Sequence, residues 1–293
     1  MPSHSAQNET VLFKIQCMEL SVSSGWPDTS IFGLKKYRRA RFEAHNALFW
    51  MARGVNSYRE KEDNNKHLEL MWETSTSTLK TRVFCDNLQV GLNFLELEIY
   101  FCEDGKKVKH SFWFDERTPA YVEAWYLVEL LHREKDQNKF STELPFHSDN
   151  FFLGDTEEHN ASSLQPELRA LHNCFTKGAD ILSQVQLDAA ADREALGEEY
   201  SLSVQPETFT LGFELCSLTD NGTKIVVGLS AGDNLRPAPF FFVSANRANR
   251  DKKSHVLDFK PENLLFLNTI NDKRMNNKDI IDILFRQVKN LAG

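Results

Sequence analysis

The chain has 293 residues, 41% of them hydrophobic and 26% charged, and a formal net charge of −8. These values are typical of a soluble globular protein with one large domain or two small ones. The acidic balance argues against nucleic-acid binding, which needs a basic face to neutralise phosphates. No apolar run approaches the roughly 18 residues of a membrane-spanning helix.

The cysteines indicate a reducing compartment. There are five of them, widely spaced and without a C-x-x-C pair, which argues against a disulfide framework or a zinc ribbon. Residues 1–10 lack the charged and apolar blocks of a signal peptide. We therefore expect a cytoplasmic protein, with no cofactor indicated by any motif.

The first part of the chain predicts a strand over 10–22 and a helix over 30–55, where Leu34, Phe42 and Phe49 recur near the helical period. A series of strands follows, and Glu-Asp-Gly at 103–105 is typical of a hairpin turn between the last two. The predicted strands are 67–75, 78–84, 92–101 and 106–115.

A helix is then predicted from Thr118-Pro119, because a cap residue followed by proline at the first helical position favours a helix start. Helical spacing predicts that one apolar face of this helix is buried. The residues of that face are Tyr121, Ala124, Trp125, Val128 and Leu131.

The second part of the chain repeats this order after a polar linker. A helix is predicted over 164–187 and a last helix over 277–291, capped by Asn276 or Asn277. Between them lie expected strands at 207–218, 224–230 and 238–245, with a short strand or a turn plus strand at 262–270. The face of the first helix consists of Leu168, Leu171, Phe175, Leu182 and Val185.

This order predicts an α+β fold with two similar halves, each containing a helix, antiparallel strands and a helix. Helices would cover the sheets on one face. We expect an N-terminal half over 1–135, a linker loop over 136–162 and a C-terminal half over 163–293. An internal duplication would produce such an order, which can also arise by chance.

Three stretches resemble, in order, a bacterial family of domains of unknown function. They are LMWETSTSTL with the EDGKKVKHSFWFD hairpin, LPFHSDN with HNASSLQPEL, and GLSAGDNLRPAPFFF. The similarity extends over roughly residues 67–291 and places His67 and Gly232-Asp233 at positions where that family has a histidine and Gly-Asp. The resemblance implies positions and no reaction, because no activity is established for the family.

The segment FHSDNFFLGDTEEH supplies nitrogen and oxygen ligands. His147, Asp149 and His159 have the composition of a histidine and carboxylate metal site. The alternative is a solvated acidic loop, since carboxylates on loops mostly lie at the surface.

Three further candidates lie in the second half. Gly232 and Asp233 could orient a ligand, or could simply form a turn in which the aspartate bonds its own backbone. Phe240 and Phe242 would share one face of the following strand. Glu214 is either a buried acid or an ordinary outward-facing residue of a half-exposed strand.

Three functions stay open at this point. The first is a binding protein that holds a small molecule or a protein partner in a pocket between its halves. The second is a metal-assisted hydrolase using His147, Asp149 and His159, with Asp233 or Glu214 as acid or base. The third is a subunit or regulator in a larger complex, which an exposed apolar patch of several hundred Å² would favour. The candidate ligand-binding residues are His67, Asp149, His159, Glu214, Gly232, Asp233, Phe240 and Phe242.

Overall fold

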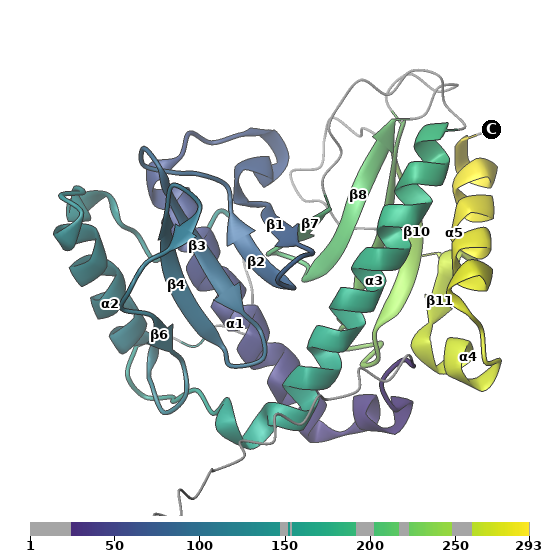
Figure 1. Cartoon of the computed structure of the whole chain (residues 1–293), viewed down its shortest axis with the longest axis horizontal. Helices are drawn as coiled ribbons and strands as arrows, with labels where there is room; N and C mark the ends of the chain where they lie inside the picture. Colours follow the sequence, from purple (N-terminus) through teal and green to yellow (C-terminus); the bar gives the residue numbers. More distant parts are fainter. Residues whose placement is uncertain are drawn as a thin grey trace, which may run out of the picture.

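A computed structural model describes residues 25–146, 152, 154–191, 202–216, 223–247 and 260–292. The predicted strand over 10–22 lies outside these residues. The described chain forms an eleven-stranded sheet with helices packed against it, which confirms the α+β class (Figure 1). None of the described helices is long and apolar enough to cross a membrane.

The strands pair antiparallel in the order β11-β10-β9-β8-β7-β1-β2-β3-β4-β5, and β6 also pairs with β4. In the first half they are β1 Leu70–Glu73, β2 Thr78–Thr81, β3 Leu88–Asn93, β4 Glu98–Glu103, β5 Lys106–Lys107 and β6 Phe112–Trp113. In the second half they are β7 Ser203–Gln205, β8 Thr210–Cys216, β9 Thr223–Ser230, β10 Phe240–Arg247 and β11 Leu264–Phe266.

Strands from both parts of the chain share one sheet. Leu70 of β1 pairs with Val204 of β7, and Met71 pairs with Ser203. The edge strand of a sheet has unpaired backbone N–H and C=O groups. Two separate sheets would expose such edges at β1 and β7, whereas here the two strands pair with each other. The similarity of the two halves and their duplication stay predictions.

The main helices are α1 Lys35–Tyr58, α2 Pro119–His132, α3 Gln165–Ala191, α4 Leu267–Asp272 and α5 Asn277–Ala292. Helix α1 packs on β2 and β3 and contacts α3, which lies on β8 and β9. Helix α5 lies beside α3 over β9 and β10. Figure 1 shows α2 at one end of the molecule, beside β4 and β6, and α5 at the other.

Aromatic rings fill the region where the two parts of the chain meet. Trp72 and Phe94 come from the first part, whereas Phe175 and Phe209 come from α3 and the β7–β8 turn. Their ring centroids lie 5.3–6.3 Å apart. Such offset and edge-to-face packing makes this region a hydrophobic core.

The predicted strand over 92–101 is wrong in its middle. Residues 94–97 form a turn between β3 and β4, in which the Asn93 side chain accepts a hydrogen bond from the Leu95 amide at 3.0 Å and Leu97 has φ 44°. The apolar run suggested a strand because Phe94 and Leu97 are buried even though they sit in a turn. An asparagine that bonds the backbone two residues ahead is a turn-forming residue.

Two helices, α3 and α5, agree closely with the prediction from the sequence. All five predicted core residues of α3 are buried. Helix α5 begins after a reciprocal cap, because the Asp279 amide donates to the Asn276 side chain and the Asn276 amide donates to the Asp279 carboxylate.

Candidate functional site

Helix α2 begins as predicted, with Pro119 in its first turn after Thr118, but the predicted buried face is wrong. The buried residues are on the other side, at Val122, Tyr126 and Leu130. Tyr126 anchors this side, since its hydroxyl donates to the Trp50 carbonyl at 2.7 Å and its ring lies 5.5 Å from Phe101. The apolar face predicted for this helix is therefore real, but it does not lie in the core.

That face is exposed to solvent. Tyr121 is 59% exposed, Val128 47% and Leu131 61%, and Ala124 is exposed between them. Residues three or four positions apart lie on one side of a helix, so these four side chains form a continuous line, which we call the α2 stripe. The Arg117 guanidinium lies 5.6 Å from the Tyr121 ring at the amino-terminal end of the stripe.

The charged groups of Glu129 and Arg133 point away from the stripe. Buried Glu129 pairs with Arg133 at 2.7 Å, and Arg133 also reaches Glu103 of β4 at 2.8 Å. Trp125 lies at the border of the stripe, where its indole N–H donates to the His110 carbonyl at 2.9 Å. These contacts fix the orientation of α2, so the stripe is held outward by the core beneath it.

His159 lies in the interior, where its Nδ1 is hydrogen-bonded to Oε2 of Glu43 on α1. The other Glu43 oxygen accepts from Arg39 Nε at 2.8 Å. The His159 ring packs 5.0 Å from both Phe114 and Phe152. Its Nε2 has no hydrogen-bond partner among the described residues.

The other two predicted metal ligands, His147 and Asp149, lie outside the described residues. The ligand-binding role predicted for Asp149 therefore stays a prediction. Within the described ranges, no three His, Cys, Asp or Glu side chains come together in a way that could hold a metal ion. The sequence identified His159 but missed Glu43, whose spacing from Arg39 is that of an ordinary surface pair on a helix.

Gly232 and Asp233 form the turn that the sequence offered as an alternative. The Asp233 carboxylate accepts from the Leu235 and Arg236 amides at 2.8 and 2.6 Å and pairs with the Arg236 side chain. Gly232 has φ +96°, which favours glycine. Arg41 of α1 donates to the Asp233 carbonyl at 3.2 Å, so the turn is docked on α1.

Phe240 and Phe242 share one face of β10, as predicted, and both are buried. Phe240 packs 5.6 Å from Phe266, and the Phe242 ring covers Gly228 so closely that a Cβ there would lie 2.7 Å from it. Phe241 faces the other way and packs edge-on to Trp26 at 5.8 Å. These aromatics are packing residues of the sheet.

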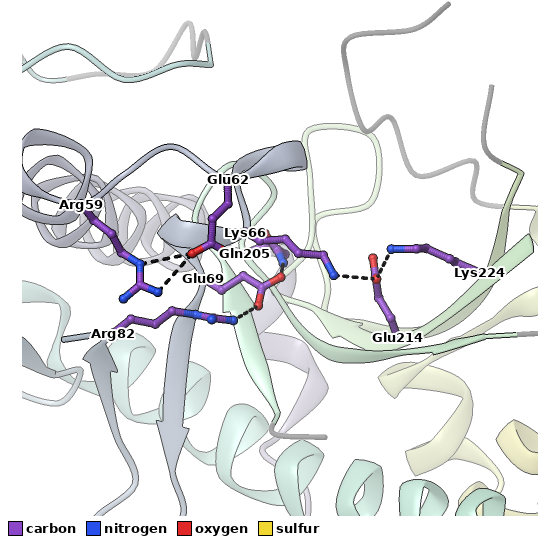
Figure 2. Close-up of polar contacts among 8 residues, drawn as sticks. All are labelled: Arg59, Glu62, Lys66, Glu69, Arg82, Gln205, Glu214 and Lys224. Atoms are coloured by element: carbon purple, nitrogen blue, oxygen red, sulfur yellow. Dashed lines mark hydrogen bonds and ion pairs between the residues drawn. The ribbon is translucent and has the colours of Figure 1, made fainter. Parts of the chain in front are cut away.

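Glu214 is a partly exposed member of an ion-pair group, 38% exposed, and not a buried acid. Figure 2 shows its carboxylate between Lys224 at 2.9 Å and Lys66 at 3.6 Å. Nearby, Glu69 binds Arg82 at 3.1 Å and the Gln205 side chain at 2.8 Å, which links the start of β1 and the end of β2 to β7. Exposed ion pairs of this kind contribute about 0–1 kcal/mol each.

His67 organises a loop at the carboxyl end of α1. Its Nδ1 accepts from the Glu62 amide at 3.2 Å and its Nε2 lies 3.5 Å from the Asn56 side chain. Burial lowers the pKa of His67, with a further contribution from Lys61, so the ring is held neutral. An adjacent hollow of about 410 Å³ is lined by residues 58–62 and 83–86.

The hollow has no activated nucleophile among its lining residues. Burial raises the pKa of Tyr58 to about 12 and also raises the pKa of the Cys85 thiol. A reactive thiol needs a lowered pKa. The two side chains are therefore in their neutral forms near pH 7.

The predicted site residues that the structure describes do not come together. His67 contacts Asn56 and the 232–233 turn contacts Arg41, and these two positions of α1 are about 22 Å apart along the helix axis. Glu214 is tied to Lys66 and Lys224, and His159 to Glu43. The described members of the candidate ligand-binding set therefore do not line one common pocket.

No protein-family model matches this chain, and neither a curated protein nor a solved structure is similar enough to count as a relative. The resemblance over residues 67–291 therefore stays a prediction.

Proposed function

We propose that this protein is a protein-binding subunit and that the α2 stripe is its binding surface. The observation that carries the proposal is the line of Tyr121, Ala124, Val128 and Leu131, apolar and open to solvent on a helix whose opposite side is fully packed. Contiguous apolar surface of this kind marks interaction sites more often than scattered exposed side chains do.

The packing of α2 supports a binding role for its exposed apolar side, because that side is not needed for packing within the chain. A surface helix normally presents a polar outer side, whereas α2 is apolar on both sides. Its inner side is already satisfied by Trp50, Phe101 and Phe140. The outer side therefore has no role in the core of a single chain, and binding would remove it from water.

The ligand-binding form of the hypothesis has less support. The meeting point of the two parts of the chain is occupied by the rings of Trp72, Phe94, Phe175 and Phe209. These rings leave no evident space for a small molecule between the halves, whereas the α2 stripe is open to a protein partner.

The test compares two exposed leucines on helices. Leu131 lies in the stripe, whereas Leu187 on α3 is 63% exposed outside it. The chain, its Leu131→Glu variant and its Leu187→Glu variant are expressed in the source cells, and gently prepared extracts are fractionated by size. We expect the wild type and Leu187→Glu to elute above the monomer mass and Leu131→Glu to elute as a monomer. Elution of the wild type as a monomer in such extracts would contradict the proposal.

A second candidate is the metal-assisted hydrolase. It is supported by one observation, that Glu43 holds Nδ1 of buried His159 while Nε2 lacks a partner among the described residues. Metal-binding histidines usually have their other ring nitrogen bonded in this way to a carboxylate or carbonyl. The measurement is the metal content of the purified protein and of His159→Gln. A bound metal that is absent from the variant supports this candidate, and a metal-free wild type rejects it.

A further inference from the structure

We infer that the partner of the α2 stripe is a second copy of this chain, bound through an antiparallel pair of α2 helices about a twofold axis. The inference rests on the proposed function, because it takes the stripe to be a binding surface. It adds which molecule binds there, in what orientation and in what register.

The order of the side chains is the first argument. Tyr121 and Leu131 lie five positions before and after Tyr126, and Ala124 and Val128 lie two positions before and after it. An antiparallel pair centred on residue 126 therefore places Tyr121 against Leu131 of the second copy and Ala124 against Val128 of the second copy. A twofold interface requires this self-complementarity, in which i contacts j and j contacts i.

The sizes of these side chains suit such a contact. Ala124 is the smallest residue of the stripe and faces the branched Val128 in this register, so the helices can approach closely at their centre. The larger Tyr121 and Leu131 fill the space toward each end. Packed helices lie about 8–10 Å apart, with the closest distances where small residues meet.

The chemistry of the stripe selects an uncharged partner surface. The charged residues of α2 are Glu123 and Glu129, and Glu129 is turned inward to Arg133. A second copy offers a surface of the same length and polarity. Antiparallel packing also places the positive end of each helix dipole near the negative end of the other. A membrane surface is a poorer match, because helices that bind it carry lysine and arginine on their polar face.

The size of the surface predicts a reversible dimer. The stripe exposes on the order of 300 Å² per copy, given about 150–250 Å² for a whole aromatic side chain. Two copies with their polar rims approach the roughly 1,000 Å² of the smaller specific interfaces. Helix α2 lies at the end of the molecule, so a second copy can reach it (Figure 1). We therefore expect dissociation in about the micromolar range.

The experiment is sedimentation velocity of the purified full chain from about 1 to 100 μM. The wild type and the control Leu187→Glu are expected to shift from monomer to dimer over this range. Leu131→Glu and Tyr121→Glu are expected to weaken the dimer at least about 30-fold, because each places a carboxylate in an apolar contact at both ends of the interface. Far-UV circular dichroism and the melting temperature establish that each variant is folded.

Register is tested by cysteine cross-linking between two differently tagged chains. One chain carries Ala124→Cys and the other carries Val128→Cys, and the mixture is oxidised at a concentration that favours the dimer. Disulfides form between Cα atoms about 4.4–6.8 Å apart. The yield of the disulfide between the two differently tagged chains should exceed the yield of disulfides between identical chains. Equal yields in all combinations would reject this register.

Other outcomes separate this inference from the proposed function. A wild type that stays monomeric at every concentration overturns the second copy as the partner. If cell extracts then still show a large species that Leu131→Glu disrupts, the stripe binds another protein and the proposed function stands. A dimer that Leu131→Glu and Tyr121→Glu leave intact overturns the inference, because the copies then meet elsewhere. If both purified protein and extracts are monomeric, inference and function fail together.

Discussion

Glu43 and His159, which are 116 positions apart in the sequence, are hydrogen-bonded to each other in the fully buried interior. The contact joins α1 to the segment that enters α3. The same segment is bonded to the start of α2, since the His159 amide donates to the Arg117 carbonyl at 3.0 Å. His159 therefore links three parts of the chain, because its side chain contacts α1 and its backbone is bonded next to the start of α2.

The first prediction concerns this pair. Glu43→Leu should lower the free energy of unfolding by about 3 kcal/mol, because it leaves buried His159 without its acceptor. The double variant Glu43→Leu/His159→Phe should cost less than the two single variants added together, because it removes both polar groups. Urea unfolding measures all three, with exposed Glu96→Leu as the control. Costs that add within about 0.5 kcal/mol would show that the two side chains are not coupled.

The second prediction concerns pH and His45. Its Nε2 donates to the Pro206 carbonyl at 2.6 Å, and burial lowers the pKa of His45 from 6.5 to about 4. Below pH 6.5 the unfolded chain binds a proton at this residue and the folded chain does not. Stability is therefore fully present above pH 6.5 and decreases as the pH falls toward 4, by up to about 3 kcal/mol.

His45→Gln tests this, because an amide N–H can still donate to Pro206. We expect the loss of stability between pH 7 and pH 4.5 to be clearly smaller in this variant than in the wild type. His110→Gln, which changes an exposed histidine outside the core, is the matched control. An identical profile for the wild type and His45→Gln would contradict a neutral, buried His45.

The third prediction concerns thiol reactivity. Cys174 of α3 is fully buried, and burial raises the pKa of its thiol far above the usual range. Alkylation requires access and the thiolate form. At pH 8 we expect iodoacetamide to label Cys174 far more slowly than the partly exposed Cys85, as followed by peptide mass spectrometry. Unfolded protein should label both at similar rates, and similar rates in folded protein would contradict the packing of α3.

The fourth prediction concerns the contact of α3 with the sheet. A Cβ on Gly178 would lie 2.5 Å from Cδ2 of Leu229 on β9, which is itself fully buried. Overpacking costs about 1–3 kcal/mol, whereas alanine favours a helix over glycine by roughly 1 kcal/mol. Gly178→Ala should therefore be destabilising, and Leu229→Val should reduce its cost in the double variant. A stabilised Gly178→Ala would show that Leu229 moves aside freely.

Sequence periodicity predicted α3 and α5 well because each has one apolar side and one polar side. It was wrong for α2, because Tyr121, Val128 and Leu131 show the same helical spacing as the truly buried Val122, Tyr126 and Leu130. The tertiary contacts of Tyr126, Trp125 and Glu129 show which side faces inward, and helical spacing alone does not contain them. The error is informative, since it identifies an apolar surface that the fold does not use.

The candidate site was partly predictable for a similar reason. His159 was identifiable by residue type, but its partner Glu43 comes from a distant helix where Arg39 already provides a local counter-charge. Asp233 was identifiable as a turn residue because aspartate and asparagine side chains bond their own backbone and the adjacent Gly232 readily adopts positive φ. Which long-range contacts a polar side chain makes depends on the fold and leaves no local spacing to detect.

The pairing of β1 with β7 in the middle of the sheet also has consequences for folding kinetics. Leu70 and Val204 meet across 134 positions of chain, whereas successive strands within β2–β4 and within β8–β10 are separated by fewer than ten residues. Closing so long a loop costs about 4 kcal/mol of chain entropy, with only a few backbone bonds as the immediate gain. We therefore expect the two sets of hairpins to form first and the β1–β7 pairing in the middle of the sheet to form last. Until it forms, each intermediate has an unpaired edge strand and is at its most prone to aggregate.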